Sequence, residues 1–450
     1  MSREKKYEID MCNGSIMDKL ISFALPLMLS GMLQLMFNAV DIVVVGRFSG
    51  SQSLAAVGAT TALIYLFTNL FIGISLGANV LAARYYAAGK HEEMSETVHT
   101  AMMFALISGI IMIFVGLFFS RLALEIMGTP SDVIDQATLY MRIYFLGMPF
   151  FMLYNYGSAI LRAVGDTKRP LIFLIISGVV NACLNMLLVI VFHLDVAGVA
   201  IATVTSQFIS CVLVIGCLYR TKSSYQLRFS RLKIRKEYLK PICQVGIPAG
   251  IQSTVINFSN ALLQSSVNSF GSTTMAGYTA ANNIFGFLYV SVNAITQACM
   301  SFTSQNYGLR KLKRMDKILM DCLILTVIVS LVLGGGVYLF GAEILRLYTE
   351  EAEVIRCGIE IFAYTTVTYF LCGIMDLFPG ALRGMDRSTV PMILSVIGTV
   401  GTRIVWVFWL FPAHRSLAFL FISYPASWLI TIVMQVICFY FVRRKVHGQQ

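Results

Sequence analysis

One sequence pattern occurs twice in this chain, about 221 positions apart. Residues 161–170 read Leu-Arg-Ala-Val-Gly-Asp-Thr-Lys-Arg-Pro, and residues 382–391 read Leu-Arg-Gly-Met-Asp-Arg-Ser-Thr-Val-Pro. The first positions and the last positions of the two segments give the same shift, since 382 − 161 and 391 − 170 are both 221. Pro26 and Pro248 are 222 apart, so one residue was gained or lost between the copies. The chain is therefore expected to fold as two related halves.

Long apolar runs fill both halves. Hydrophobic residues make up 57% of the 450 and charged residues 13%, whereas a soluble domain carries about 25% charge. A run of about 20 apolar residues spans a bilayer, and only a helix crosses lipid singly with its backbone satisfied. We therefore predict an all-α integral membrane protein with twelve transmembrane helices in two pseudo-symmetric six-helix bundles, a build typical of secondary transporters. The runs are 18–45, 54–80, 97–119, 137–160, 170–192, 197–219, 242–269, 278–302, 318–340, 356–382, 389–411 and 416–441.

The distribution of Lys and Arg predicts the orientation. With the N-terminus inside, 27 Lys and Arg residues fall in the inner segments and 5 in the outer loops. Positive charge favours the cytoplasmic side, so we predict a multi-pass protein of the cell membrane with both termini cytoplasmic. The basic segment 220–241 is predicted to be a cytoplasmic linker between an N-terminal lobe, 1–219, and a C-terminal lobe, 242–450. Six crossings in each lobe make the two copies parallel repeats.

Composition also bears on the class of function. The net charge of +11 lies in loops between apolar runs, and no separate basic domain indicates nucleic-acid binding. The ten cysteines form no Cys-x-x-Cys pair, and the runs hold no His cluster or nucleophile motif. Gly73 and Gly77, four apart, predict close helix packing. We therefore expect no enzyme activity, no cofactor, no nucleic-acid partner, contact with membrane lipid, and a monomer.

Asp41 is the main candidate functional residue. Ionisable groups deep in a membrane are costly, so each is a candidate for function. Asp41 is followed by four apolar residues, 42–45, and burial enables a carboxylate to hold a proton near neutral pH. With oxygen partners it could instead bind sodium, so the coupling ion is left as a proton or Na⁺. The alternative is a carboxylate that only packs helices.

Polar residues at helical spacing provide partners for Asp41. Gln34 and Asn38 lie seven and three positions before it on one helix face. Asn181 and Asn185 are four apart in the fifth run, and Thr203 lies in the sixth. Their oxygens could complete a proton or small-cation site. Each amide taken alone equally fits hydrogen bonding between helices.

The second half carries amide stripes of its own. Amides at spacings of three and four cannot face lipid, so they predict a watered substrate cavity between the bundles. Aromatic faces suit cationic ligands. The remaining predicted cavity residues are Tyr154, Asn155, Asn257, Asn260, Gln264, Asn282, Tyr289, Asn293, Gln297 and the deep cation Arg403.

The two halves differ at their deep acids. A shift of 222 places Leu263 opposite Asp41, and a shift of 221 places Asp376 opposite Asn155. Each half therefore keeps one deep acid, at non-equivalent positions. Cation coupling is expected to be asymmetric, so that replacing either acid by Asn gives unequal defects.

These segments resemble a known family. The run from Pro26 through Asp41 to Gly46, the stretch Leu54-Ala-Ala-Val-Gly58, and the repeated loop closed by Pro are similar to the multidrug and toxic compound extrusion (MATE) family. Gly198-Val-Ala-Ile-Ala-Thr203 resembles the start of its sixth helix. The resemblance covers nearly the whole chain and implies two six-helix lobes.

The resemblance implies a secondary antiporter that exports organic cations or drugs against protons or sodium ions by rocker-switch alternating access. It implies that Asp41, Asn181, Asn185 and Thr203 form the cation site of the amino lobe, and that Pro26 marks a hinge. Some relatives have a second carboxylate where Asn185 stands, which weakens the case for sodium.

The carboxyl lobe departs more from the family, and we assign Asp376 to coupling or cation attraction. The alternative function is a lipid-linked saccharide or lipid flippase of the wider superfamily. A diphosphate headgroup should need several Arg or Lys, whereas Arg403 is the one deep cation of the runs.

Overall fold

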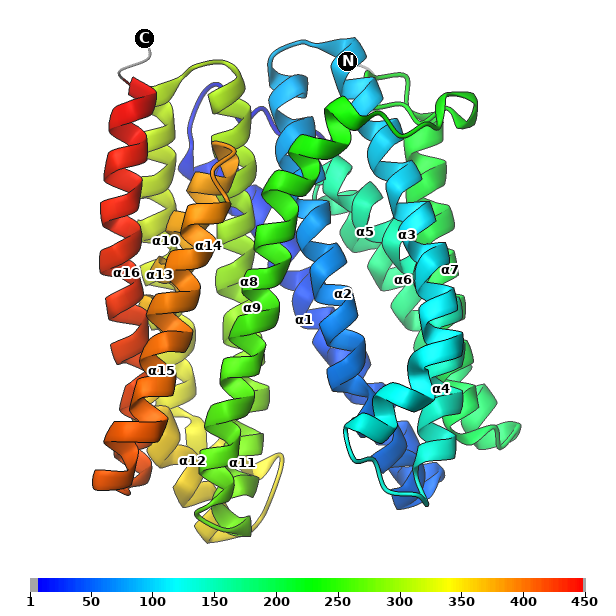
Figure 1. Cartoon of the computed structure of the whole chain (residues 1–450), viewed down its shortest axis with the longest axis vertical. Helices are drawn as coiled ribbons and strands as arrows, with labels where there is room; N and C mark the ends of the chain where they lie inside the picture. The colour runs from blue at the N-terminus through cyan, green and yellow to red at the C-terminus, as the bar shows by residue number, and fades with distance from the viewer. Residues whose placement is uncertain (1–6, 448–450) are drawn as a thin grey trace. The chain divides into compact units, whose positions relative to one another are not determined.

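The chain folds into helices joined by turns. The structure is a computed structural model that describes residues 7–447, and no strand occurs within that range (Figure 1). Arg3, Lys5 and Lys6, counted above for orientation, lie outside it. The first half contains α1 (Met17–Phe48), α2 (Gly50–Ala87), α3 (His91–Ile126), α4 (Ile134–Leu146), α5 (Met148–Ala163), α6 (Lys168–Asn185), the π-helical η2 (Met186–Val191) and α7 (Asp195–Arg220).

The second half repeats this order with more interruptions. The short 3₁₀ turn η3 (Phe229–Arg231) precedes it in the connection. The elements that follow are α8 (Lys236–Asn268), α9 (Ser272–Gly308), α10 (Leu312–Leu339), α11 (Gly341–Arg346), α12 (Ala352–Thr365), α13 (Tyr369–Gly384), α14 (Thr389–Ser395), η4 (Val396–Gly401), α15 (Thr402–Val405), η5 (Trp406–Leu410), η6 (Phe411–Ala413) and α16 (Leu417–His447).

Most of the twelve predicted runs are helices that could cross a membrane. Within residues 7–447, nine helical spans are long and apolar enough, and α12 with α13 makes a tenth if that pair, bent by 50°, is one span. The run predicted at 137–160 is divided into α4 and α5, and the run at 242–269 lies in α8. Neither run is counted among these spans, each for a physical reason. The helices α4 and α5 are each too short, and α8 is less apolar because it carries amides such as Asn257 and Gln264.

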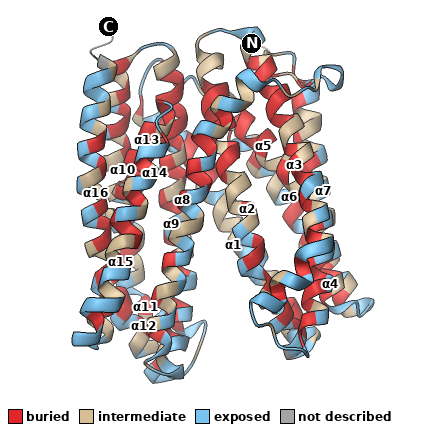
Figure 2. Ribbon diagram, viewed as in Figure 1, coloured by how far each residue is buried: buried red, intermediate tan, exposed pale blue. Residues whose placement is uncertain are grey.

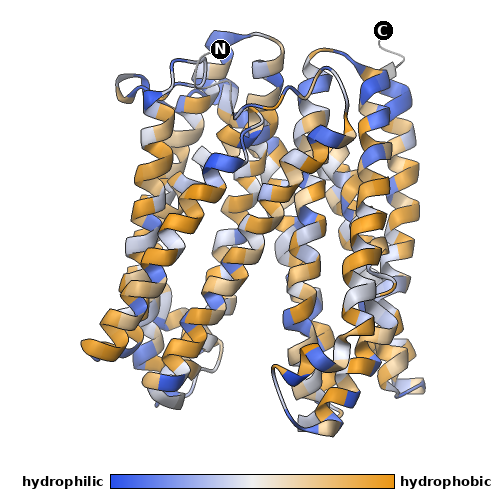
Figure 3. Cartoon of the chain, turned by 180° about the vertical axis from the view of Figure 1, so that it is seen from behind, coloured by the Kyte–Doolittle hydropathy of each residue, from blue (hydrophilic) through white to orange (hydrophobic). Residues whose placement is uncertain are grey.

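Hydrophobic side chains cover much of the outer surface. Phe118 is 73% exposed, Leu339 74% and Trp409 69%. Exposed positions run along whole helices (Figure 2), and hydrophilic residues concentrate at the connections (Figure 3). Such extended apolar exposure is not tolerated in water and is typical of a membrane protein.

The repeat extends to backbone conformation. Three turns with a positive φ occur at matching positions of the two halves, each pair 221 apart. Positive φ is easy for glycine and rare for other residues, so Arg310 and Asp386 are held in it by the fold around them. The pairs are Gly50 (84°) with Gly271 (99°), Gly89 (67°) with Arg310 (54°), and Gly165 (94°) with Asp386 (61°).

Two compact units make up the chain, and their bounds do not follow the two halves. Of the described residues, one unit contains 7–10 and Leu29–Gly250, and the other contains Met11–Met28 and 251–447. The start of α1 therefore belongs to the unit built mainly from the second half, and the start of α8 to the unit built mainly from the first. Each unit has its own apolar core. The lobes 1–219 and 242–450 and the linker 220–241 remain a prediction.

Both transfers between units occur two residues after a proline. Pro26 precedes the change after Met28, and Pro248 precedes the change after Gly250. Proline inside a helix removes one backbone hydrogen bond and weakens the helix at that turn. Pro26 in α1 and Pro248 in α8 therefore lie next to the points where each helix passes from one unit to the other.

Glycines let α2 and α8 approach closely within the first unit. A Cβ atom on Gly73 would lie 2.3 Å from the backbone nitrogen of Gly250, and one on Gly77 would lie 2.0 Å from the carbonyl oxygen of Ile242. Gly246 meets Ile74 in the same way. The predicted packing role of Gly73 and Gly77 is thus visible as a backbone contact that a larger residue would prevent.

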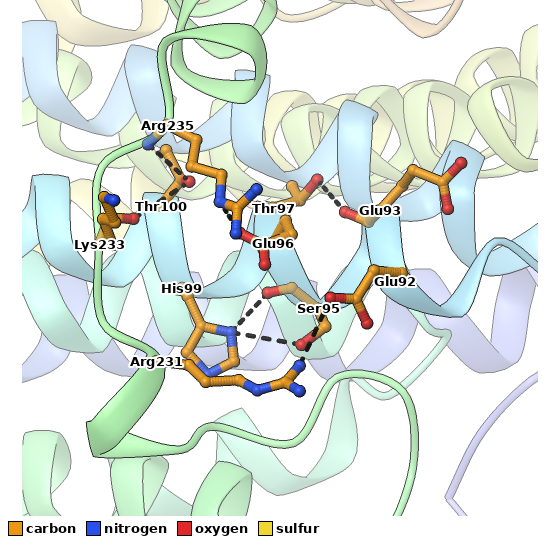
Figure 4. Close-up of polar contacts among 10 residues, drawn as sticks. All are labelled: Glu92, Glu93, Ser95, Glu96, Thr97, His99, Thr100, Arg231, Lys233 and Arg235. Carbon is orange, nitrogen blue, oxygen red and sulfur yellow. Dashed lines mark hydrogen bonds and ion pairs between the residues drawn. The ribbon is translucent and has the colours of Figure 1, made fainter.

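The basic connection before α8 is fixed to the start of α3. Arg235 Nε lies 2.6 Å from Glu96 Oε2, and the backbone nitrogen of Arg228 donates to His99 Nε2 at 3.0 Å. Thr100 accepts a hydrogen bond from the backbone nitrogen of Arg235 at 3.3 Å (Figure 4). The segment therefore carries its positive charge on a polar helix end rather than as a free chain.

Candidate functional site

Asp41 and two asparagines come together in the first unit. Asp41 lies in α1, and Asn181 and Asn185 lie one turn apart on α6. Asn185 Nδ2 donates to Asp41 Oδ1 and lies 3.3 Å from Asn181 Oδ1. Asn185 is fully buried and Asn181 is 5% exposed, whereas Asp41 is partly buried. The carboxylate therefore sits at the edge of a buried amide pair.

A glycine on α6 lets α1 come close enough for this contact. A Cβ atom on Gly178 would lie 1.9 Å from the Phe37 ring, so only glycine fits there. Asn181 and Asn185 follow on the next turns, and Asp41 follows Phe37 by one turn of α1. The π-helical η2 starts at Met186, directly after Asn185. Such turns are frequent at functional sites.

The hydrogen bonds around Asn185 are incomplete. Its Oδ1 atom is buried and has no donor among the described residues. No Lys, Arg or His of residues 7–447 forms an ion pair with Asp41, whose one polar contact is the Asn185 amide. A buried carbonyl without a donor costs about 1–3 kcal/mol. A hydroxyl on a protonated Asp41 would supply that donor if the amide turned over, so the pair has hydrogen-bonding arrangements for both charge states of Asp41.

Other residues predicted for this site lie elsewhere or bond elsewhere. The Thr203 hydroxyl donates to the Val199 carbonyl of its own helix at 2.9 Å. Gln34 and Asn38 are exposed on α1. Tyr140 and Tyr144 of α4, which were not predicted, lie close enough to Asp41 to interact with its charge. Their four-residue spacing on one helix face was the available signal.

Arg403 is the centre of a polar cluster in the second unit. It lies in α15 and is 2% exposed. Its Nη1 atom lies 2.7 Å from Asn260 Oδ1 and 3.4 Å from Ser259 Oγ, and Nε lies 3.3 Å from Ser427 Oγ. The guanidinium carbon stands 4.5 Å from the centre of the Tyr424 ring. Of these partners only Asn260 was predicted, because isolated serines give no signal in sequence.

Asp376 belongs to a second charged group on α13. Arg383, seven residues later on the same helix, is the charge that acts on Asp376, and its Nη2 atom donates to Gln252 Oε1 at 2.7 Å. Tyr289 of α9 is 43% exposed and interacts with both charges. The charge of an arginine therefore acts on the deep acid of the second half, unlike Asp41.

The remaining predicted cavity residues make mostly local contacts. Gln264 donates to Asn268 at 3.0 Å and Gln297 to Asn293 at 2.7 Å, each along one helix. Asn155 donates to the Phe151 carbonyl at 2.8 Å, and the Tyr154 hydroxyl to the Pro170 carbonyl at 3.1 Å. The exposed members are Asn257 and Asn282.

Comparison with known proteins identifies the family. The MatE family model matches residues 26–187 and 248–409. The chain is 28% identical to "Probable multidrug resistance protein YoeA" of Bacillus subtilis over 94% of this chain and 93% of that protein. It is 21% identical to "Multidrug export protein MepA" of Staphylococcus aureus over 88% and 87% of the two chains.

Solved structures confirm the predicted fold. A structure described as the outward-facing conformation of a multidrug resistance MATE family transporter has a TM-score of 0.89 at 19% identity, over 97% of this chain and 98% of that one. The expected all-α architecture of two six-helix halves is therefore confirmed. With a family model that covers most of both halves, the chain belongs to the MatE family, as its repeated loops and first helix suggested.

Proposed function

We propose that this protein exports organic cations, drugs among them, across the cell membrane in exchange for an inward-moving proton bound at Asp41. The names of the relatives support drug export, since YoeA and MepA are described as a multidrug resistance and a multidrug export protein. The lipid-facing helices support a multi-pass membrane location.

The Asp41–Asn185 contact carries this proposal. A membrane-embedded carboxylate without a cationic partner is costly when it is charged and empty. Binding a proton or a cation removes that cost. Because the site holds a single carboxylate beside buried amides, protonation of Asp41 alone sets the charge of the site, and that charge sets its affinity for a cation.

The amide geometry favours a proton over sodium. Sodium, a hard cation, prefers several oxygen ligands, but Asn185 presents its NH₂ group to Asp41. Thr203 uses its hydroxyl within its own helix. An ionised Asp41 accepts from the Asn185 amide, and a protonated Asp41 can donate to the amide oxygen, so protonation needs only a side-chain rotation.

The transport cycle follows from linkage between the two cations. Protonation of Asp41 from outside neutralises the site and disfavours a bound organic cation, which leaves. Access then alternates by a rocker-switch motion, Asp41 loses its proton to the cytoplasm, and the anionic site again favours a cationic passenger. The passenger and the proton shift the same equilibrium in opposite directions, which is the requirement for exchange.

Vesicle transport with separate ion gradients tests the proposal. Purified wild-type protein in proteoliposomes should expel a cationic dye when a proton gradient is imposed and fail to do so with a sodium gradient alone. Asp41→Asn should reconstitute normally and lose at least nine-tenths of that efflux (about 1.4 kcal/mol per factor of ten).

A matched control is available on the surface. Asp132 is an exposed acid in the connection before α4, so Asp132→Asn should keep wild-type efflux. Wild-type efflux from Asp41→Asn would refute the role of Asp41. Efflux driven by sodium alone would show that the coupling ion is sodium instead.

A further inference from the structure

Arg403 has hydrogen-bond donors that the protein does not use. A guanidinium group carries five N–H donors. Nε and Nη1 point to Ser427, Ser259 and Asn260, while Nη2 forms no hydrogen bond with any residue of 7–447. Arg403 also lacks a carboxylate partner within that range, although it is 2% exposed. A buried charge without a counter-ion is costly, so this arrangement calls for an anion.

In the repeat, Arg403 is equivalent in sequence to a residue of the amide pair of the first unit. Pro170 and Pro391 are 221 apart, whereas the two family-model matches end 409 − 187 = 222 apart. The second half therefore has one residue more than the first after Pro391. At a shift of 222 Arg403 takes the place of Asn181, and Asn260 takes the place of Asn38.

The π-helical turn η4 accommodates this extra residue within the helix. The first half has one π-helical segment here, η2, whereas the second half has η4 before Arg403 and η5 after it. A π-helical turn holds more residues than an α-helical one and is frequent at functional sites. Gly398 in η4 lets α16 come close, since a Cβ atom there would lie 3.0 Å from the Thr431 Cα. Ser427, one turn before Thr431, thereby reaches Arg403.

The equivalent positions of the two halves thus differ in charge. Asp41 and its amides form an acidic site in the first unit, and Arg403 with its hydroxyls and amide forms a basic one in the second. The Tyr424 ring lies over the guanidinium, and Nη2 is the nitrogen that has no hydrogen-bond partner among residues 7–447. An oxyanion is the group that best matches guanidinium N–H donors.

We propose that the Arg403 cluster (Arg403, Ser259, Asn260, Ser427 and Tyr424) binds the carboxylate of passengers that carry both a carboxylate and a cationic group. This inference rests on the proposed export function for its transport consequence, but the anion site itself does not. Arg403 is therefore the residue that determines specificity between passengers with and without a carboxylate.

Binding to the purified protein tests the anion site directly. All three tryptophans, Trp406, Trp409 and Trp428, lie in the second half, and the Trp428 ring is 5.7 Å from that of Tyr424. Sodium benzoate should change the wild-type tryptophan emission saturably, and benzyl alcohol, which has the ring without the charge, should not. Arg403→Gln should weaken benzoate binding at least ten-fold, while Arg415→Gln, at an exposed arginine, should leave it unchanged. Saturable binding of chloride with the same loss would indicate an inorganic-anion site instead and overturn the carboxylate assignment.

Transport of a matched dye pair tests the consequence. A rhodamine with a free carboxylate and the methyl ester of the same dye differ only at the group assigned to Arg403. Arg403→Gln should reduce export of the acid at least ten-fold more than export of the ester. An equal reduction for both dyes would contradict the proposal, as would wild-type protein that binds no benzoate. Failure of the wild type to export either dye would refute the export function, and benzoate binding would still decide the anion site.

Discussion

At the scale of single residues, Asn185 supports both charge states of Asp41. Its amide donates to the ionised carboxylate, and its buried oxygen has no other donor among the described residues. Asn185→Leu keeps the branched shape and the number of heavy atoms and removes both functions. We expect roughly a ten-fold loss of proton-driven dye efflux, in keeping with about 1–3 kcal/mol for an unmade buried hydrogen bond.

The measurement is initial efflux rate per reconstituted protein. Asn282→Leu, at an exposed position of the second unit, serves as the surface control for an Asn-to-Leu change. Unaltered efflux from Asn185→Leu would show that the Asn185 amide has no role in proton-driven efflux.

The two deep acids should respond differently to the same substitution. Asp41 has only an amide partner, whereas Asp376 interacts with Arg383 on its own helix. Asp41→Asn should abolish coupling, and Asp376→Asn should leave a charged Arg383 and reduce rather than abolish efflux. Parallel assays under one proton gradient would measure both variants, and defects of the same size would contradict the asymmetry.

Sequence spacing predicted some of these residues and missed others for identifiable reasons. Asn181 and Asn185 share a face because they are four apart, and the contact with Asp41 follows from the approach of α1 and α6 at Gly178. The amides of α8 and α9 were predicted to line a cavity, but the same spacing of four lets Gln264 and Gln297 bond along their own helices. Periodicity gives the face of a residue, not its partner.

At the scale of helices, the crossing of α2 with the start of α8 depends on glycine. Gly77→Ala would place a Cβ atom 2.0 Å from the Ile242 carbonyl, so the helices must separate. We expect this overpacking to cost about 1–3 kcal/mol and to lower the melting temperature in detergent.

Gly58 gives a control on the same helix, because a Cβ atom there meets nothing within 4 Å. Gly58→Ala should be neutral or slightly stabilising, since alanine favours a helix by about 1 kcal/mol over glycine. Equal melting temperatures for the two variants would show that the close crossing does not limit stability.

Helix interruptions were harder to predict than helices. The apolar run 137–160 was predicted as one helix although Gly147 and Pro149 lie inside it, and Pro149 stands in the first turn of α5. The π-helical turns η2, η4 and η5 also leave no mark in hydropathy, because their side chains remain apolar. Length and composition indicate that a segment spans a membrane, but not whether its backbone is α-helical or π-helical or where the helix breaks.

At the scale of the whole molecule, each compact unit needs a segment from the other half. The unit around α2 to α7 includes the start of α8, and the unit around α9 to α16 includes the start of α1. Expressed alone, each half therefore lacks part of its own core. Two chains, 1–230 and 231–450, should both be degraded when expressed singly.

Co-expression of the two pieces should restore a folded, active protein. The two pieces should co-purify and restore dye efflux, because each supplies the missing helix segment of the other. Stable, separately purified halves that do not associate would contradict the exchange of segments. The duplication itself was readable from the sequence, whereas this exchange was not, because it arises where Pro26 and Pro248 interrupt helices that look continuous.

In the proposed cycle one carboxylate, Asp41, binds the proton and the passenger in turn. Purified protein in weakly buffered detergent solution, with a pH indicator present, should release protons in proportion to the cationic dye that it binds. Asp41→Asn should bind the dye weakly and release none. Undiminished proton release on dye binding to Asp41→Asn would place the exchanged proton on another group and contradict this account.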